Sequence, residues 1–167
     1  MRRFLRPGHK FCGRLMPCCD TKYFGPAAYT EDALITLPDG PMGFPGAHTF
    51  VLIQRPAEFP LVYMQSTADP DLCFLALPVF SVNPAYRLAI RPADAAALGT
   101  ATCPAIGLQV LCLSLLSLHA DGATANLLAP VVVNLNTRIA RQCINVEPGY
   151  SHQHPLPAHT AEEGAAA

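Results

Sequence analysis

Charged residues are scarce in this sequence: they occupy 14% of the 167 positions, whereas hydrophobic residues occupy 51%. So little charge beside so much apolar side chain argues against a disordered chain and favours one folded domain. From Met16 onward the balance is acidic, with six Lys and Arg against twelve Asp and Glu and a formal charge of −6. Phosphate contacts need clustered Lys and Arg, so we expect no direct binding to nucleic acid and favour a basic protein partner.

Long apolar runs are also missing. The longest, residues 106–118, contains Gln109, Ser114 and Ser117 and is well short of the roughly 20 residues that cross a bilayer. No continuous apolar stretch of signal-peptide length follows the basic N-terminus. We therefore expect no membrane span and no export signal, and we interpret the long run as a buried strand.

The seven cysteines lack the spacing of a disulfide framework and of a paired Cys-x-x-Cys zinc site. This pattern is typical of reduced thiols, and it favours a cytoplasmic location. Cys73, Cys112 and Cys143 lie inside apolar runs, where cysteine behaves as a small hydrophobic residue. We expect these three side chains in the core.

Motifs for several common chemistries are absent. No Gly-rich turn leads into Lys and Ser or Thr as in a phosphate-binding loop, and no Gly-x-Ser-x-Gly elbow presents a serine. His152 and His154 alternate as strand residues do and could share a metal, which keeps one alternative open, a small metal- or cofactor-dependent β-barrel enzyme. Pro155 interrupts this segment and a third ligand is missing, so a surface pair is favoured. We expect no catalytic residue, no metal and no cofactor.

Seventeen prolines and eleven glycines divide the chain into short segments that suit strands better than long helices. Apolar or alternating runs between these breaks predict about nine strands, at residues 33–37, 49–54, 61–66, 72–77, 86–90, 106–118, 124–128, 131–135 and 138–146. Pro92, Asp94 and Gly99 stand at the start, first turn and end of one short helix. Connections of hairpin length favour an all-β fold, either a compact antiparallel barrel-like domain or two packed sheets.

Three parts are expected along the chain. Residues 1–15 hold five of the eleven basic residues and differ from the rest, as a disordered basic arm or a mis-assigned start with Met16 as the true first residue. Residues 16–156 are expected to form the β domain. Residues 157–167 lack apolar periodicity and are expected to be a flexible tail.

Several segments, taken in order, resemble the FliW family. They are Thr21-Lys22-Tyr23-Phe24-Gly25; Ile35-Thr36-Leu37-Pro38-Asp39-Gly40 with Gly43-Phe44; Gln65-Ser66 with Asp69-Pro70-Asp71-Leu72 and Phe74; Ala125-Asn126-Leu127 with Ala129-Pro130-Val131-Val132-Val133-Asn134; and Arg141-Gln142, Tyr150 and His154-Pro155-Leu156. The resemblance spans about residues 21 to 156, and its Asn-Leu-x-Ala-Pro-Val-Val-Val-Asn block is fairly specific.

The resemblance implies a compact β-barrel-like fold, no catalysis and a regulatory role in the cytoplasm. Members of the FliW family bind flagellin and, when free, bind the RNA-binding repressor CsrA, which then releases the flagellin message. The acidic balance after Met16 is compatible with docking on a basic RNA-binding protein. Flagellin and CsrA are therefore the expected partners.

The residues that carry the resemblance fall into two groups. Those at turns are expected to contact partners: Phe44, Gln65, Asp69 and Asp71. Those in or beside strands are expected to maintain the fold: Asn126, Leu127, Pro130, Asn134 and Gln142. Two departures from the family pattern bear on partner binding. Gly40-Pro41-Met42-Gly43-Phe44 replaces the common Gly-Leu-Pro-Gly-Phe and is expected to move Phe44, and residues 93–107 are nearly uncharged.

Overall fold

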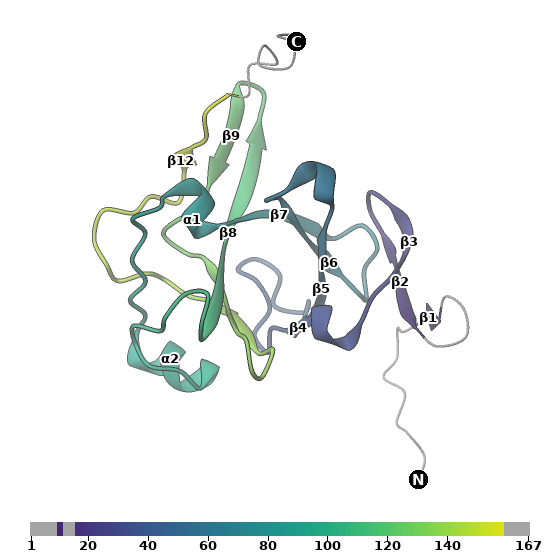
Figure 1. Cartoon of the computed structure of the whole chain (residues 1–167), viewed down its shortest axis with the longest axis horizontal. Coiled ribbons are helices and arrows are strands. Elements are labelled where there is room, and N and C mark those ends of the chain that lie inside the picture. The colour runs from purple at the N-terminus through teal and green to yellow at the C-terminus, as the bar shows by residue number, and fades with distance from the viewer. Residues whose placement is uncertain (1–9, 12–15, 159–167) are drawn as a thin grey trace.

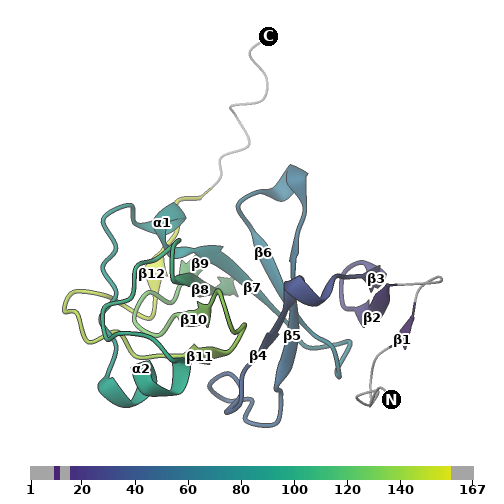
Figure 2. The same ribbon diagram turned by 60° about the horizontal axis from the view of Figure 1, so that its bottom comes forward.

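The computed structural model describes residues 10–11 and 16–158. Its centre is an antiparallel sheet with the order β11-β10-β8-β7-β6-β5-β4 (Figure 1; β10 and β11 are labelled in Figure 2). These strands are β4 (Leu34–Thr36), β5 (Thr49–Gln54), β6 (Val62–Ser66), β7 (Cys73–Pro78), β8 (Val110–His119), β10 (Val131–Asn134) and β11 (Ala140–Gln142). The all-β, antiparallel prediction is confirmed.

The sheet curls so that its two ends approach each other (Figure 2). The Thr36 amide, at the end of β4, donates a 3.0 Å hydrogen bond to the Arg138 carbonyl, and Thr36 forms a parallel bridge with Ile139 just before β11. β7 helps the sheet to bend, because its first residues pair with β6 and its last residues pair with β8. The described residues thus form a barrel-like sheet. Its two end strands, β4 and β11, are linked by this single bridge and not by a continuous ladder of hydrogen bonds.

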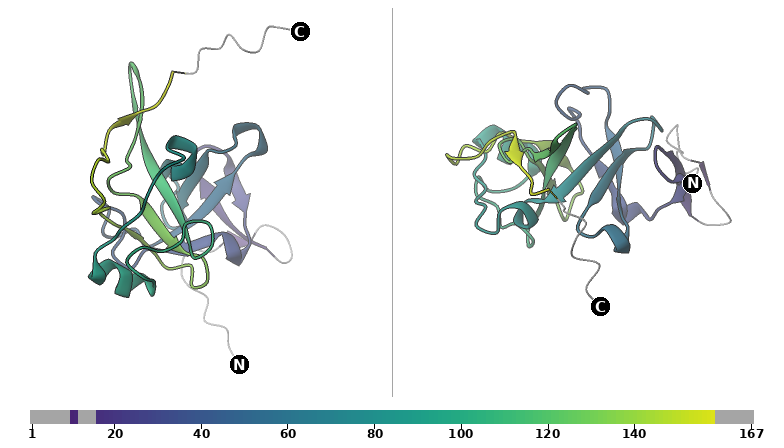
Figure 3. Two further views of the ribbon diagram at one scale, coloured as in Figure 1. Left: turned by 60° about the vertical axis from the view of Figure 1, so that its left-hand side comes forward. Right: turned by 90° about the horizontal axis from the view of Figure 1, so that it is seen from above.

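A narrow ribbon extends from this sheet. The second half of β8 pairs with β9 (Gly122–Ala125), and β9 pairs in turn with β12 (His154–Pro155). The ribbon projects beyond the body of the domain (Figure 3). β8 therefore has two roles, since its first half is a central strand of the sheet and its second half carries the projecting hairpin.

Both faces of the central strands are buried. Val131 and Val133 of β10 pack with one apolar cluster around Phe50, Met64 and Leu113, whereas Val132 packs with the other. The second cluster contains Val110, Cys112 and Cys143, and it is covered by α2 (Pro92–Leu98) and the extended segment 86–90. Each large apolar side chain so buried contributes roughly 1.5–3 kcal/mol. Cys112 and Cys143 are buried as expected, whereas Cys73 is half-buried.

The short helix is confirmed as α2. Pro92 occupies its first position, and Gly99 follows its end in the left-handed region at φ 69°. A second, four-residue helix, α1 (Val79–Val82), follows β7 directly. Single-turn 3-10 helices lie at Glu31–Ala33 and Pro56–Glu58. Within the described residues, no helix is long and apolar enough to span a membrane.

The strand predicted at residues 86–90 is wrong, although its burial alternates as expected. Tyr86, Leu88 and Ile90 are buried, yet the segment joins no ladder. Side chains replace the missing strand neighbour: the Asn145 Oδ1 accepts from the Ala89 amide at 3.0 Å, and the Tyr150 hydroxyl accepts from the Arg87 amide at 2.8 Å. The backbone is extended, and other parts of it bond to isolated backbone groups, since the Ile90 amide donates to the Thr102 carbonyl and the Ala89 carbonyl accepts from the Val146 amide, both at 2.8 Å.

Several strand boundaries also differ from the prediction. Residues 106–109 turn before β8, with the Gln109 amide bonded to the Ala105 carbonyl at 2.9 Å. β9 ends at Ala125 because the Asn126 side chain accepts from the Ala129 amide at 2.8 Å and closes a turn. Of the strand predicted at residues 138–146, only β11 forms. The structure also contains a hairpin of β2 (Pro17–Thr21) and β3 (Gly25–Ala28), which the sequence patterns did not indicate.

The predicted N-terminal extension is described at two positions. Lys10 and Phe11 form β1, which pairs with β2. The other residues of the extension before Met16, and the predicted tail beyond Ala158, lie outside the described residues. The three-part division of the chain stays a prediction.

Candidate functional site

Two loops of the resemblance meet at one end of the sheet. Residues 37–48 connect β4 to β5, and residues 67–72 connect β6 to β7 (Figure 2). The register Thr36 with Thr49 and Gln65 with Cys73 brings both connections to the same edge. Antiparallel pairing therefore gathers Phe44, Asp69 and Asp71, which the sequence separates by about 25 residues, at one end of the molecule.

Phe44 lies at the boundary between solvent and core. Its side chain is 42% exposed, and its ring packs edge-on against Phe74 with 5.1 Å between centroids. Phe74 in turn lies 6.0 Å from the fully buried Phe50. One face of Phe44 is thus held by the aromatic column, whereas the other remains available to a partner.

The two acidic turn residues are exposed, and their backbone is fixed locally. The Asp69 carboxylate accepts from the Asp71 amide at 3.0 Å, and the Ser66 hydroxyl accepts from the Asp69 amide at 3.1 Å. Such turns hold the backbone without tertiary contacts. The Asp71 side chain stands in solvent beside this turn.

Gln65 requires a correction, because it lies at the end of β6 and not on the surface. Its side chain is 1% exposed, and its Nε2 lies 3.1–3.2 Å from the carbonyl oxygens of residues 66, 69, 70 and 72. Its Oε1 accepts from the Lys22 amide at 3.0 Å. A buried amide so occupied cannot contact a partner. It fixes the 67–72 loop and the β2–β3 turn together.

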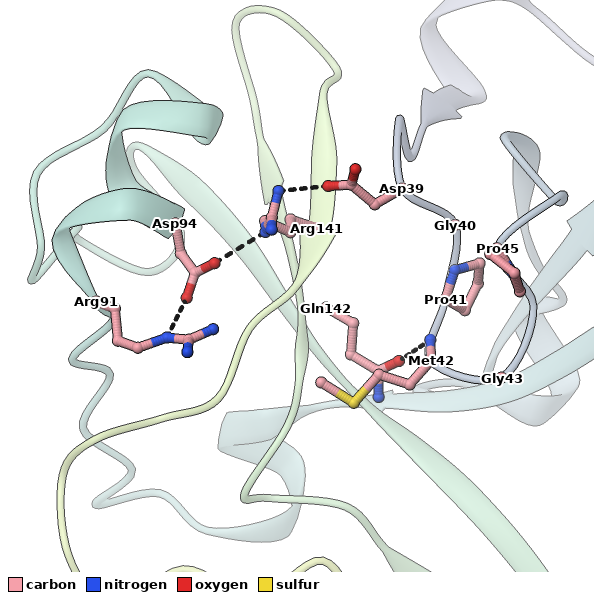
Figure 4. Close-up of a pocket in the computed structure, with 10 residues that line it drawn as sticks. All are labelled: Asp39, Gly40, Pro41, Met42, Gly43, Pro45, Arg91, Asp94, Arg141 and Gln142. Atoms are coloured by element: carbon pink, nitrogen blue, oxygen red, sulfur yellow. Dashed lines mark hydrogen bonds and ion pairs between the residues drawn. The ribbon is translucent and has the colours of Figure 1, made fainter.

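The loop 39–45 also forms one wall of a pocket of about 500 Å³. α2 and β11 provide the other side through Arg91, Asp94, Arg141 and Gln142 (Figure 4). Asp94 is 1% exposed, and its carboxylate binds the Nε of Arg141 at 2.8 Å and the Nε of Arg91 at 3.0 Å. Two guanidinium groups offset the cost of burying this one carboxylate.

Asp39 completes the ion network from the opposite wall. Its carboxylate pairs with Nη1 of Arg141, so that Arg141 bridges the loop and the buried Asp94. The same charged groups affect the pKa of the Cys143 thiol. Burial, with a contribution from the Asp94 carboxylate, raises its pKa to about 12, while Arg141 and Arg91 oppose the rise. Cys143 therefore remains a neutral thiol.

Glycine determines the shape of the loop. Gly40 has φ 67°, and a Cβ built there would lie 2.1 Å from the Phe44 carbonyl oxygen. Gly43 also has positive φ, at 87°. The Met42 amide then donates to the Oε1 of Gln142 at 2.8 Å, which anchors the loop to β11. In this loop Met42 lines the pocket and Phe44 packs against Phe74. Whether the Pro41-Met42 departure moves Phe44 stays a prediction.

The remaining motif residues lie at chain reversals. Asn134 donates to the Leu98 carbonyl at 2.8 Å and accepts from the Asn136 amide at 2.9 Å, so it ties α2 to the turn after β10. Leu127 and Pro130 are buried, and Asn126 closes the turn before them. Gln142 donates to the Ala129 carbonyl at 3.0 Å while accepting from the 39–45 loop. Their contacts are internal.

The histidine pair of the enzyme alternative lies at the base of the projecting ribbon. His154 belongs to β12 opposite Ala125, and the exposed His152 stands in the preceding turn. Across residues 10–11 and 16–158, no three His, Cys, Asp or Glu side chains are grouped so as to hold a metal.

The ion network was not predicted from the sequence. Asp94 has a local explanation, because a carboxylate in the first turn of a helix is favoured by the helix dipole. Nothing in the spacing indicates that Arg141, which lies in another element, reaches it. The one available signal is the position of Arg141 within the segments that resemble the family.

Comparison with known proteins agrees with this geometry. The family model described as FliW protein matches residues 18–156. The flagellar assembly factor FliW of Desulfitobacterium hafniense (strain Y51) is 34% identical over 135 residues, 80% of this chain and 86% of that protein. That of Treponema pallidum (strain Nichols) is 32% identical over 152 residues, 87% and 95% of the two chains.

A solved structure shares the fold as well. The crystal structure of the flagellar assembly factor FliW superposes with a TM-score of 0.72 at 29% identity, covering 86% of this chain and 99% of that one. The matched family region contains both loops at the sheet end, the pocket and the internal motif residues. This chain belongs to the FliW family.

Proposed function

We propose that this chain is a cytoplasmic flagellar assembly factor. It binds flagellin and, when free, binds and antagonises the translational regulator CsrA, which relieves repression of flagellin synthesis. Support comes from the family match over residues 18–156 and from relatives that carry the name flagellar assembly factor. The two partners are those implied by the family resemblance.

The observation that carries this proposal is the meeting of two family loops at one end of the sheet. We call this the sheet-end surface, and define it by Met42, Phe44, Asp69 and Asp71. It combines two partly exposed apolar side chains with two exposed carboxylates, on a domain whose net charge after Met16 is negative. Apolar contact with an acidic rim suits a basic protein partner.

The regulatory behaviour follows from competition for a limited protein. When flagellin accumulates, it occupies the factor and leaves CsrA free to repress; when flagellin is exported, the free factor binds CsrA. Linkage requires that the partner in excess determines how much factor remains for the other. The rate of flagellin synthesis then follows the rate of flagellin export, and this chain performs no catalytic step.

The test is direct binding of purified flagellin and CsrA, measured by calorimetry at low salt. Binding of both at micromolar concentration is expected, with D69K/D71K weakening CsrA binding by roughly tenfold through charge repulsion. The control is D121K, which makes the same kind of charge change at the tip of the β8–β9 hairpin. Failure of the unmodified chain to bind either partner would remove the proposal.

A different measurement distinguishes this proposal from the alternative, a metal- or cofactor-dependent enzyme that uses His152 and His154. We propose that the chain acts by binding, without a metal or cofactor, so metal analysis of the purified protein is expected to find no stoichiometric metal. One bound equivalent that disappears in His154→Ala would favour the enzyme instead.

A further inference from the structure

The pocket between loop 39–45 and α2 brings two arginine side chains onto one buried carboxylate. Asp94 is the buried carboxylate, and both of its oxygens are used, Oδ1 by Arg141 and Oδ2 by Arg91. One negative charge therefore faces two guanidinium groups, and this trio carries a formal charge of +1. A pocket with such an excess favours a further anion.

Asp39 supplies that anion in the present structure, but from an exposed position. Its side chain is 63% exposed and it reaches Arg141 from the glycine-containing loop. Exposed ion pairs of this kind contribute little to stability, because water and salt compete with them. Asp39 is thus a weakly held counter-ion, and another carboxylate of similar reach can replace it.

Arg91 provides a second point of attachment. It binds Asp94 through Nε alone, and its side chain is 57% exposed. Within the described part of the chain, the two terminal nitrogens of Arg91 have no ion-pair or hydrogen-bond partner. Since Asp94 fixes both guanidinium groups through Nε, their outer nitrogens remain oriented for a carboxylate in the pocket (Figure 4).

The rest of the lining limits what the carboxylate can belong to. Pro41, Met42 and Pro45 form an apolar wall opposite the arginines, and the pocket of about 500 Å³ admits more than a single small ion. A ligand that uses both walls carries an acidic group beside an apolar one. An extended peptide with Asp or Glu next to a Leu-like residue has this chemistry.

We propose that this pocket binds an aspartate or glutamate side chain from an extended segment of a partner protein, which displaces Asp39 from Arg141. The adjoining apolar side chain of that segment packs on Met42. The chemistry of the pocket alone defines this ligand, and neither flagellin nor CsrA is required for it. Asp39 acts as an internal competitor that keeps the pocket occupied until the segment arrives.

The test uses two neutral-ended peptides, Ac-Leu-Glu-Leu-NH2 and Ac-Leu-Gln-Leu-NH2, titrated into the full chain at low salt. Binding is followed by NMR through the Nε–Hε signals of Arg91 and Arg141. The Glu peptide is expected to shift both signals saturably, with a roughly millimolar Kd. The Gln peptide is expected to bind at least about fivefold more weakly, since it lacks the charge.

Two variants identify the site. Asp39→Asn is expected to tighten binding of the Glu peptide about threefold or more, because removing the competitor raises the fraction of free pockets. Arg91→Gln is expected to weaken it about fivefold or more. Arg87→Gln, which changes an exposed arginine paired with Glu147, is the matched control and leaves binding unchanged. Amide spectra and thermal melts verify that each variant is folded.

Four outcomes would overturn the proposal. The first is equal binding of the Glu and Gln peptides, and the second is the absence of any saturable shift for the Glu peptide with both the unmodified chain and Asp39→Asn. The third is tighter binding of a free C-terminal carboxylate, tested with Ac-Gly-Leu-OH. The fourth is equal affinity for inorganic phosphate, which would make the pocket a general anion site.

Discussion

Asn145 donates a 2.9 Å hydrogen bond from Nδ2 to the hydroxyl of Tyr86, across 59 positions of sequence, and both side chains are buried. The Tyr86 hydroxyl donates in turn to the Leu127 carbonyl at 2.8 Å. Asn145 also accepts from the amides of Ala89 and Glu147. One amide side chain therefore joins three segments that have no common ladder.

Replacing Asn145 by alanine is expected to lower the free energy of unfolding by roughly 2–4 kcal/mol. The change leaves the Ala89 amide and Arg87 carbonyl without their partner, and unsatisfied buried groups bear the full cost of desolvation. Urea denaturation measures the loss. Tyr86→Phe removes the hydroxyl but keeps the ring, and it is expected to lower the free energy of unfolding by about half as much. Equal stability of Asn145→Ala and the parent would contradict a stabilising role for this network.

The same network explains how far sequence patterns could predict this fold. The alternation of Tyr86, Leu88 and Ile90 correctly predicts which side chains are buried, because the periodicity of two depends only on an extended backbone. Whether an extended segment pairs with a strand depends on what satisfies its amides. Here the Ala89 and Arg87 amides donate to the side chains of Asn145 and Tyr150, and the Ile90 amide donates to the Thr102 carbonyl. No local pattern indicates these partners.

Gln65→Ala is expected to loosen two segments together. It removes the donor that lies within 3.2 Å of the 67–72 loop carbonyls and the acceptor for the Lys22 amide. The predicted loss of stability is roughly 2–4 kcal/mol, from an empty buried site and unpaired backbone groups. Hydrogen exchange should show faster exchange at residues 67–72 and at Lys22. The exposed Asp71→Asn is the control, with a change within about 0.5 kcal/mol.

Alkaline pH is expected to destabilise the fold through buried thiols. Burial raises the pKa of Cys73 to about 11 and, with Asp94, that of Cys143 to about 12, against 9.0 for an ordinary thiol. Below about pH 9 both states bind the proton and stability is unaffected; above it the unfolded state releases protons that the folded state keeps. Stability therefore falls as pH rises, by up to about 1.4 kcal/mol per pH unit for the fully buried Cys143.

Urea midpoints measured under reducing conditions between about pH 8 and pH 10.5 test this direction. Cys143→Ala is the informative variant, because its midpoint should fall less steeply than that of the parent even if its stability at neutral pH is lower. A parent midpoint that is constant across this range would show that these thiols titrate normally in the folded chain.

The candidate site was predicted only in part, for a physical reason. Turn chemistry correctly placed Phe44, Asp69 and Asp71 at exposed positions, because Gly, Pro and Asp favour turns whatever surrounds them. The same argument placed Gln65 wrongly, since Gln65 is still part of β6 and its side chain faces inward. The Arg141 network depends on tertiary packing, which residue spacing does not encode.

Gly40→Ala is expected to distort the loop that carries both Met42 and Phe44. The added Cβ would lie 2.1 Å from the Phe44 carbonyl oxygen, and an alanine at φ 67° is strained even with space around it. We expect a loss of roughly 1–3 kcal/mol in the free energy of unfolding. Because backbone atoms cannot yield as a flexible side chain can, relief must come from moving the 39–45 loop. Binding at the sheet-end surface should then weaken as well.

Gly46→Ala is the matched control for this effect. It lies in the same loop, but its φ is outside the positive range and no atom lies within 4 Å of its built Cβ. Its stability should change by less than about 0.5 kcal/mol, and its affinity for CsrA should match that of the parent. If Gly40→Ala binds CsrA as tightly as Gly46→Ala while losing stability, the shape of this loop contributes to folding alone and the sheet-end surface does not depend on it.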